Sequence, residues 1–221
     1  MEALIKIGGS LIRTPKSLRS LCKKIAEIRK ESKICLVPGG SIFADAVREV
    51  DREYKLNNKS SHNMAILAMD QYGFILQDLI PNSIIFDQPE DYKKVLNKQK
   101  IPIFLPAQYF LKNDPLENSW NITSDSIAIH IAKQLKINQV IKVTDVDGIF
   151  DIDPKKSSTA KLYEKISAKE LVNLDNITCI DKELGRFLLF SNISCAIVNG
   201  HYPKRVINIL KNKPTICTLI T

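Results

Sequence analysis

The stretch IKVTDVDGIFDIDPK, residues 141–155, decides the predicted fold of this chain. It begins as an apolar strand that can be buried on both faces of a parallel sheet. Thr144, Asp145 and Asp147 then follow, and because buried carboxylates need partners, these side chains should lie where the strand emerges. In open α/β sheets, ligands bind at the carboxyl ends of the strands. Taken alone, the stretch fits a polar turn slightly better than a ligand site, since an Asp before Gly148 is also ordinary turn chemistry.

Two glycine turns occur earlier in the chain, each after a short apolar strand pattern and before a helical pattern. Gly8, Gly9 and Ser10 close the first strand, and Gly39 and Gly40 close the second. Without a Cβ, glycine lets backbone N–H groups approach a ligand, and a helix N-terminus favours an anion. Neither turn has the spacing of a Walker A loop or of a dinucleotide fingerprint. The pair predicts phosphate binding of another type, although two ordinary strand-to-helix turns remain an alternative.

Four polar or aromatic side chains are candidates for a site. Lys6 interrupts a buried strand, so its amine should reach an exposed edge or meet an anion. Asp125 opens a helix expected from residue 124 to 135, where a carboxylate also complements the helix dipole. His62 opens another predicted helix, and a capping or surface role is slightly favoured over substrate contact. Trp120 fits a pocket wall and a core position equally well.

The remaining apolar segments alternate between strand and helix patterns. Alternation of this kind predicts a parallel sheet flanked by helices. The further predicted strands are residues 83–86, 103–105, 193–199 and 215–220, and the further predicted helices are residues 15–28, 91–96, 168–172 and 203–210. We therefore expect an α/β protein, with residues 1–221 forming a single three-layer α/β/α domain around a mostly parallel central sheet.

Composition narrows the classes of function. At 221 residues and 44% hydrophobic residues the chain can bury a sizeable core. The net charge of +8 suggests nucleic acid, but the basic residues are spread out and mixed with acids, so we expect no nucleic-acid partner. No apolar run approaches a membrane span and the start is strand-like, so we expect a cytoplasmic protein with no membrane partner. The five cysteines lack CxxC spacing and predict buried, reduced thiols.

Several motifs occur in the order found in the amino acid kinase family. These are KIGGS at 6–10, PGG at 38–40, SDSIA at 124–128, TDVDGIF at 144–150 with DPK at 153–155, and VNG at 198–200. The chain resembles this family nearly from end to end. The resemblance implies the amino acid kinase fold, ATP and Mg²⁺ as cofactors, and a homo-oligomer that is a dimer or larger. It also places the acceptor side mainly in residues 1–120 and the nucleotide side mainly in residues 121–221.

The resemblance also implies roles for individual residues. Lys6 resembles the lysine that bridges the transferred phosphoryl group, and Asp125 resembles the aspartate that orders the catalytic lysines. The family's second catalytic lysine often follows a Gly-Gly-Met run, which is absent here, and Lys182 in the corresponding region is the candidate. The implied ATP-binding residues are Gly8, Gly9, Ser10, Thr144, Asp145, Gly148, Phe150, Asp153 and Lys155. The implied acceptor-binding residues are Gly39, Gly40, His62, Trp120 and Asn121, and no side-chain metal ligand is predicted.

Within the family, residues 62–73 and 120–126 most resemble the archaeal kinases of methanofuran biosynthesis. Those kinases use ATP to convert [5-(aminomethyl)furan-3-yl]methyl phosphate, a small phosphate monoester, into a diphosphate. The resemblance implies the same reaction here. Uridylate kinase or isopentenyl phosphate kinase activity is the alternative within the family. A non-catalytic nucleotide- or anion-binding protein with the same fold is the alternative from another class.

Overall fold

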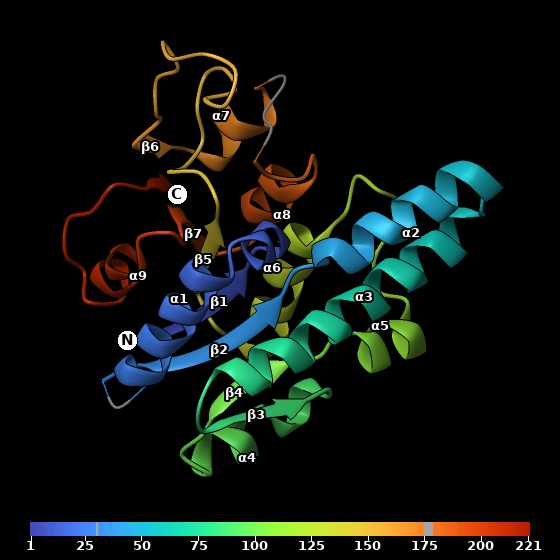
Figure 1. Ribbon diagram of the computed structural model, residues 1–221, viewed down its shortest axis with the longest axis horizontal. Helices are drawn as coiled ribbons and strands as arrows, with labels where there is room; N and C mark the ends of the chain where they lie inside the picture. The colour runs from blue at the N-terminus through green and yellow to red at the C-terminus, as the bar shows by residue number, and fades with distance from the viewer. Residues whose placement is uncertain (30, 175–178) are drawn as a thin grey trace.

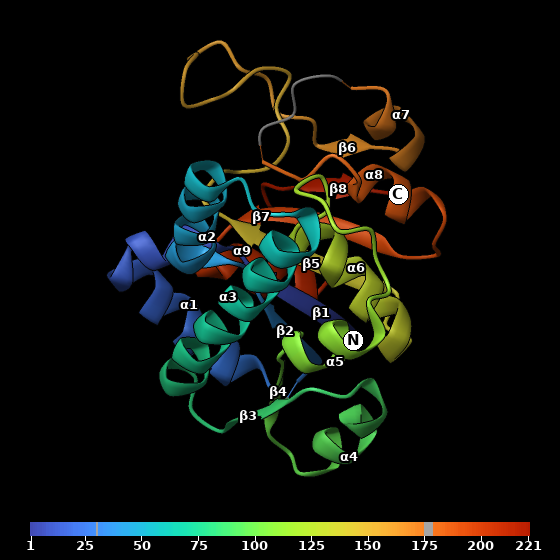
Figure 2. The same cartoon turned by 90° about the vertical axis from the view of Figure 1, so that its right-hand side faces the viewer.

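A central sheet of eight strands organises the computed structural model, which describes residues 1–29, 31–174 and 179–221. The strands are β1 (Glu2–Ile7), β2 (Lys33–Pro38), β3 (Ser83–Phe86), β4 (Ile101–Phe104), β5 (Gln139–Thr144), β6 (Lys165–Ile166), β7 (Ser194–Asn199) and β8 (Thr218–Ile220). Their order across the sheet is β3-β4-β2-β1-β5-β7-β8-β6, from bottom to top in Figure 2. Only β7 and β8 pair antiparallel among these strands. The predicted α/β class with a mostly parallel sheet is confirmed.

Helices connect the strands and cover the sheet (Figure 1). The α-helices are α1 (Pro15–Ile28), α2 (Ser41–Tyr54), α3 (Asn58–Leu79), α4 (Tyr92–Asn97), α5 (Ala107–Asn113), α6 (Ser124–Leu135), α7 (Ala168–Val172), α8 (Leu184–Leu189) and α9 (Pro203–Leu210). Two short 3-10 helices are η1 (Gly9–Arg13) and η2 (Pro89–Asp91). The predicted helices are all present, with ends that differ by a few residues.

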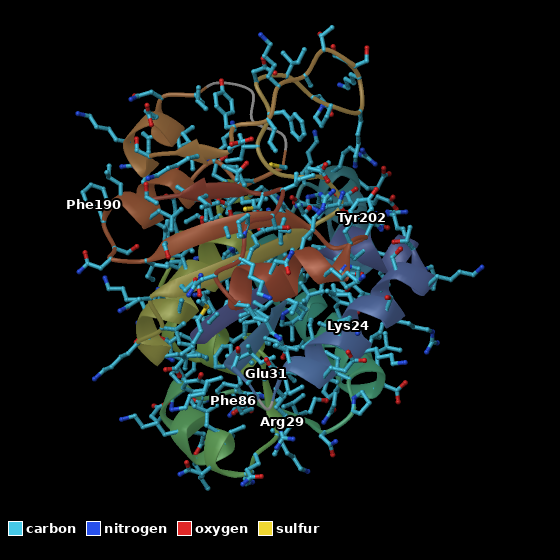
Figure 3. The ribbon with its side chains drawn as sticks, turned by 90° about the vertical axis from the view of Figure 1, so that its left-hand side faces the viewer. Lys24, Arg29, Glu31, Phe86, Phe190 and Tyr202 are labelled. Atoms are coloured by element: carbon cyan, nitrogen blue, oxygen red, sulfur yellow. The ribbon has the colours of Figure 1, made fainter. Side chains whose placement is uncertain are left out.

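The two faces of the sheet hold separate apolar cores, which gives the predicted three layers. Successive side chains of a strand point to opposite faces. In β1, Ala3, Ile5 and Ile7 pack in one core with apolar residues of α1 and α9. Leu4 belongs to the other core, with residues of α4 to α8. Figure 3 views the first of these faces, where Lys24 lies on α1 and Tyr202 at the start of α9.

The same alternation decides where two charged strand residues point. Lys6 shares the face of Leu4 in β1, and Lys142 shares the face of Val140 in β5. Both lysines are almost completely buried, at 6% and 5% exposure. Because this face is covered by α6, the charge that compensates the two lysines must come from that helix or from its neighbours.

Two long helices bring distant residues over the carboxyl ends of the strands. α2 begins directly after the second glycine turn, and α3 returns beside it, as Figure 1 shows. The side chain of Asn57 caps α3 by accepting a hydrogen bond from the Ser60 backbone N–H. Ala68 in the middle of α3 therefore packs against Ala44 and Val47 in the first half of α2, and His62 lies in the first turns of α3.

Four of the five cysteines are buried in the apolar cores and Cys179 is half-buried; all are free thiols. This matches the predicted reduced thiols. In the described ranges, no helix has both the length and the apolar character needed to cross a membrane.

Candidate active site

A buried cluster of three charges lies beneath the carboxyl edge of the sheet. The Lys6 ammonium donates to Oδ1 of Asp125 at 2.7 Å, and the Lys142 ammonium donates to Oδ2 of the same carboxylate. Lys6 and Lys142 are register partners on neighbouring parallel strands, so their side chains leave the sheet together toward α6. The structure therefore joins Lys6 and Asp125, which the sequence predicted as partners, and adds Lys142.

The charges in this cluster are strongly coupled. Burial alone would raise the pKa of the Asp125 carboxyl, but the two ammonium groups hold it well below its usual range. Burial lowers the pKa of Lys6, and the neighbouring Lys142 charge acts in the same direction against the attraction of Asp125. Two cations share the Asp125 carboxylate, and Asp181 adds a second negative charge close by. Each ammonium group keeps donors that suit a further anion.

Asp181 positions the helix that carries Asp125. Its carboxylate accepts hydrogen bonds from the backbone N–H groups of Thr123 and Ser126, both at 2.9 Å, and from both of their hydroxyls. Thr123 itself makes no capping hydrogen bond, so Asp181 caps α6 from outside the helix. The Asp181 backbone N–H also donates to Asp125 at 3.2 Å. Burial and the Asp125 charge raise the pKa of Asp181.

The two glycine turns touch each other above this cluster. A Cβ on Gly9 would lie 2.3 Å from the backbone nitrogen of Ser41, and a Cβ on Gly39 would lie 2.8 Å from the backbone nitrogen of Gly9. Gly8 donates its N–H to the carbonyl of Val143 at 2.7 Å, which ties the first turn to the end of β5. Glycine is thus required by close backbone approach, and backbone N–H groups from both turns gather at one point, as a phosphate site needs.

A pocket of about 250 Å³ opens beside the turns. Its walls come from η1, the first half of α2, the first half of α3 and residues 119–127. They include Gly9, Ser10, Gly40, His62 and Trp120, all predicted as site residues, together with Arg13, Ser41, Asp45, Arg48, Ser61 and Ser124. Ser10, which the sequence assigned to ATP, therefore lines the same pocket as residues that the sequence assigned to the acceptor. Asn121 is exposed and is not among the residues that line this pocket.

The outer wall of the pocket is aromatic and charged. The Trp120 indole N–H donates to Asp51 at 2.7 Å, and the Arg48 guanidinium carbon lies 4.5 Å from the centre of the Trp120 ring. Asp45 forms ion pairs with Arg13 at 2.8 Å and with Arg48 at 3.4 Å. Trp120 is therefore a pocket wall, held in place from two sides. The wall presents cations, a carboxylate and an aromatic ring within one small space.

His62 lines the inner part of the pocket and is 6% exposed. Burial lowers its pKa, with a smaller opposing effect from Asp114, which favours the neutral imidazole. A surface or capping role is wrong for His62, because Asn57 caps the helix and the imidazole is buried against the pocket.

The predicted nucleotide residues follow β5 on the far side of the glycine turns. Asp145 forms an ion pair with Lys155 at 2.5 Å, and Asp153 accepts a hydrogen bond from the Lys155 backbone N–H at 2.9 Å. Of the remaining three, Thr144 is buried at the end of the strand. Gly148 has no Cβ and so leaves room for the Thr218 hydroxyl. Phe150 forms an isolated antiparallel β-bridge with Leu162. These six residues belong to one continuous stretch of the chain, and their contact with adenosine stays a prediction.

Asp147, which the sequence placed in a turn, connects three parts of the chain. Its carboxylate accepts hydrogen bonds from Asn199 at the end of β7, at 2.8 Å, and from Arg205 in α9, at 2.6 Å. These contacts fasten the turn after β5 to the neighbouring strand and helix. Asp147 thus supports the edge of the sheet on which the predicted nucleotide residues lie.

Lys182 lies next to the site but outside the buried cluster. Its side chain is exposed, and it directly follows Asp181 in the segment that caps α6. No described contact tests the role predicted for Lys182. The sequence analysis missed Lys142, Asp181 and Ser41. A lysine inside a buried strand was the available signal for Lys142, as it was for Lys6, whereas nothing local distinguishes Asp181.

Comparison with known proteins extends over almost the whole chain. The profile of the amino acid kinase family matches residues 1–188. A [5-(aminomethyl)furan-3-yl]methyl phosphate kinase from Methanocaldococcus jannaschii is 37% identical over 217 residues, covering 98% of this chain and 96% of that protein. A uridylate kinase from Methanococcus aeolicus is 26% identical and covers 96% of each chain.

Solved structures show the same architecture. The UMP kinase from Ureaplasma parvum has a TM-score of 0.80 at 21% identity, and the match covers 100% of this chain and 98% of that one. The uridylate kinase from Archaeoglobus fulgidus has a TM-score of 0.80 at 20% identity, and the match covers 100% of both chains. At such identities the likeness concerns the fold, and the predicted fold is confirmed.

Proposed function

Because the chain belongs to the amino acid kinase family, we propose that it is an ATP- and Mg²⁺-dependent kinase that converts a small phosphate monoester into a diphosphate. The observation that carries this proposal is the cluster of Lys6, Asp125 and Lys142 beneath two touching glycine turns. Phosphoryl transfer depends on positioning and on stabilisation of charge, and this arrangement provides both.

The state of Asp125 favours a phosphate as the acceptor. A hydroxyl acceptor needs a group that takes up its proton, whereas an ionised phosphate oxygen does not. Asp125 is engaged by two ammonium groups, and its lowered pKa makes it a poor base. The site therefore suits an acceptor that is already an anion.

We propose [5-(aminomethyl)furan-3-yl]methyl phosphate as the acceptor. The pocket of about 250 Å³ suits a small molecule. Trp120 offers a surface for a planar ring, Asp45 a carboxylate for an ammonium group, and Arg13 and Arg48 cations for a phosphate. The 37% identical relative bears the name of a kinase for this compound. Uridylate kinase activity is the second candidate, because relatives of 26% identity and less bear that name.

Mg²⁺ would enter the site with ATP. Mg²⁺ in kinases is commonly bound by substrate phosphates, water and one or two carboxylates. The described residues contain no group of three His, Cys, Asp or Glu side chains placed to hold a metal. Asp145, directly after β5, is paired with Lys155 and would have to exchange that partner to join such a complex. When bound, Mg²⁺ would neutralise charge on the phosphates.

We further propose that the protein works in the cytoplasm, where ATP is available, and as a dimer or larger homo-oligomer. Apolar side chains on the outer faces of α2 and α3 support self-association. Tyr54 is 73% exposed and Phe74 is 54% exposed. Ile42, Val50 and Leu67 are further exposed apolar residues on these two neighbouring helices, and a contiguous apolar patch is typical of a surface that binds another chain.

A substrate panel tests the proposed function. The protein would be incubated with ATP, Mg²⁺ and, in separate reactions, the aminomethylfuran phosphate, UMP and isopentenyl phosphate, and ³¹P NMR would detect a new diphosphate. We expect product from the furan phosphate. Product from UMP or isopentenyl phosphate alone would reassign the acceptor, and ATP binding without any transfer would indicate a non-catalytic protein.

Substitution of the charged cluster tests the chemistry. We expect Lys6→Ala and Asp125→Ala to reduce kcat by about a hundredfold or more, as for loss of one preorganised electrostatic group. The Lys24→Ala variant is the control, because Lys24 lies on the exposed side of α1. Steady-state kinetics and circular dichroism would be measured together, and a folded Lys6→Ala variant with near-normal kcat would contradict the proposal.

A further inference from the structure

We propose that Lys142 is the second catalytic lysine, whose ammonium binds the transferred phosphoryl group together with that of Lys6. This inference rests on the proposed phosphoryl transfer and concerns a residue to which the family motifs assign no role. In the step, an oxygen of the acceptor phosphate forms a bond to the γ-phosphorus of ATP. The bond from that phosphorus to the β–γ bridging oxygen breaks, and its electron pair leaves with ADP. Lys142 keeps its proton throughout.

The register of the sheet places Lys142 level with Lys6. The two residues are paired across β1 and β5, and both side chains reach the same carboxylate, one on each oxygen. The carbonyl of Val143, the next residue in β5, accepts the Gly8 N–H at 2.7 Å. Lys142 therefore lies as close to the first glycine turn along its strand as Lys6 does along its own. A phosphoryl group within reach of one ammonium is within reach of the other.

The ammonium groups of Lys6 and Lys142 have unused hydrogen-bond donors that could bind an anion. An ammonium group has three donors. Within the described part of the chain, the hydrogen bond to Asp125 is the one found for each of the two lysines. Buried donors are normally satisfied. Asp181 adds a negative charge near both lysines but, within the described residues, accepts no hydrogen bond from either. Phosphoryl oxygens would supply the missing acceptors.

Asp125 and Asp181 explain why Lys142 is held rigidly. Asp125 fixes both ammonium groups, and Asp181 fixes the helix turn that carries Asp125. Catalytic stabilisation is strongest when charged groups are already in place before the reaction. The exposed side chain of Lys182 lacks such support. The buried cluster therefore contains the two lysines that the reaction needs, without a contribution from Lys182.

Three variants compare the two assignments. Lys142→Met should lower kcat by about a hundredfold while the KM values for ATP and acceptor change by less than about threefold, because the contact of Lys142 with the bound phosphate strengthens in the transition state. Lys142→Met should remain folded, since Lys6 and Asp125 are left as a balanced pair. Lys182→Met should reduce kcat far less. Lys133→Met is the matched control, because Lys133 is exposed on α6 away from its N-terminus. A large loss of kcat in Lys182→Met with a near-normal Lys142→Met would overturn the inference.

A measurement without turnover separates this inference from the proposed function. In protein labelled with ¹⁵N-lysine, the buried ammonium groups of Lys6 and Lys142 should give slowly exchanging NMR signals. We expect both signals to move when Mg²⁺ and the non-hydrolysable analogue adenylyl imidodiphosphate are added. This result would support Lys142 as a phosphate ligand even if no acceptor were phosphorylated. A shift of the Lys6 signal alone would overturn it, whether or not the Lys142→Met variant folds.

Discussion

Ser41 begins α2 with a backbone φ of 59°, in the left-handed region that favours glycine. Its hydroxyl is buried, lines the pocket and has no hydrogen-bond partner among the described residues. Strained backbone and an unsatisfied buried donor both destabilise a folded protein, and they occur together mainly at functional sites. We therefore expect the Ser41 hydroxyl to donate to a phosphate oxygen of the acceptor.

Two substitutions separate binding from strain at Ser41. Ser41→Ala should raise the acceptor KM roughly tenfold, since a hydrogen bond to a charged group contributes about 1.5 kcal/mol or more. It should not lower the free energy of unfolding, because the hydroxyl has no partner to lose. Ser41→Gly should raise the acceptor KM similarly and increase the free energy of unfolding, because glycine adopts this φ without strain. An unchanged acceptor KM in both variants would contradict the role in binding.

At the scale of secondary-structure elements, the N-terminus of α6 is held by a residue far away in the sequence. Asp181 lies 55 positions from Ser126, yet its carboxylate accepts from the first turn of the helix. A local cap could hold the helix end as well. The distant cap does more, because it also ties the segment before α8 to the helix that carries Asp125.

Removal of this cap should affect stability and activity together. Asp181→Ala should lower the free energy of unfolding by about 2 kcal/mol, since it leaves buried N–H and hydroxyl donors unsatisfied. It should also lower kcat, because Asp125 loses its support. Asp181→Asn keeps an acceptor oxygen and should be affected less in both respects. Urea denaturation and steady-state kinetics would check this, and a loss of stability with unchanged kcat would show that the cap is purely structural.

At the scale of the whole molecule, the pocket and the predicted nucleotide segment lie on either side of the glycine turns. The pocket with Trp120 and His62 lies over α2 and α3, whereas the predicted nucleotide residues follow β5, and the loop after β5 extends beyond the upper edge of the sheet in Figure 1. The glycine turns and the buried lysines lie between the two regions. Transfer from a donor on one side to an acceptor on the other would thus pass over the charged cluster.

Asp153 tests this division. We expect Asp153→Ala to raise the KM for ATP about tenfold through loss of one or two hydrogen bonds, while kcat and the acceptor KM change little. Asp151→Ala is the control, because Asp151 also accepts backbone hydrogen bonds in the same loop but is not a predicted ligand. If both variants raised the KM for ATP equally, the cause would be a loss of loop stability and not the loss of a contact between Asp153 and ATP. A fall in kcat with an unchanged KM for ATP would indicate that Asp153 acts in phosphoryl transfer and not in ATP binding.

The sequence by itself determined the class of fold, the order of most elements and part of the site. Strand and helix patterns, the two Gly-Gly turns, Lys6 and Asp125 are all local features, and local features can be read directly. The motif order even identified the family. His62 and Trp120 were found as candidates, but whether they formed a pocket depended on the packing of α2 against α3 and residues 119–127.

The tertiary structure alone decided which charges meet. Lys142 became the partner of Asp125 through the register of β5 against β1, which no local pattern specifies. Asp181 became the cap of α6, and Ser41 acquired its unpaired hydroxyl, through contacts between segments far apart in the chain. Hydrophobic patterns place side chains on a face of the sheet, but the pairing of buried charges depends on distances of a few ångströms, which only the packed structure defines.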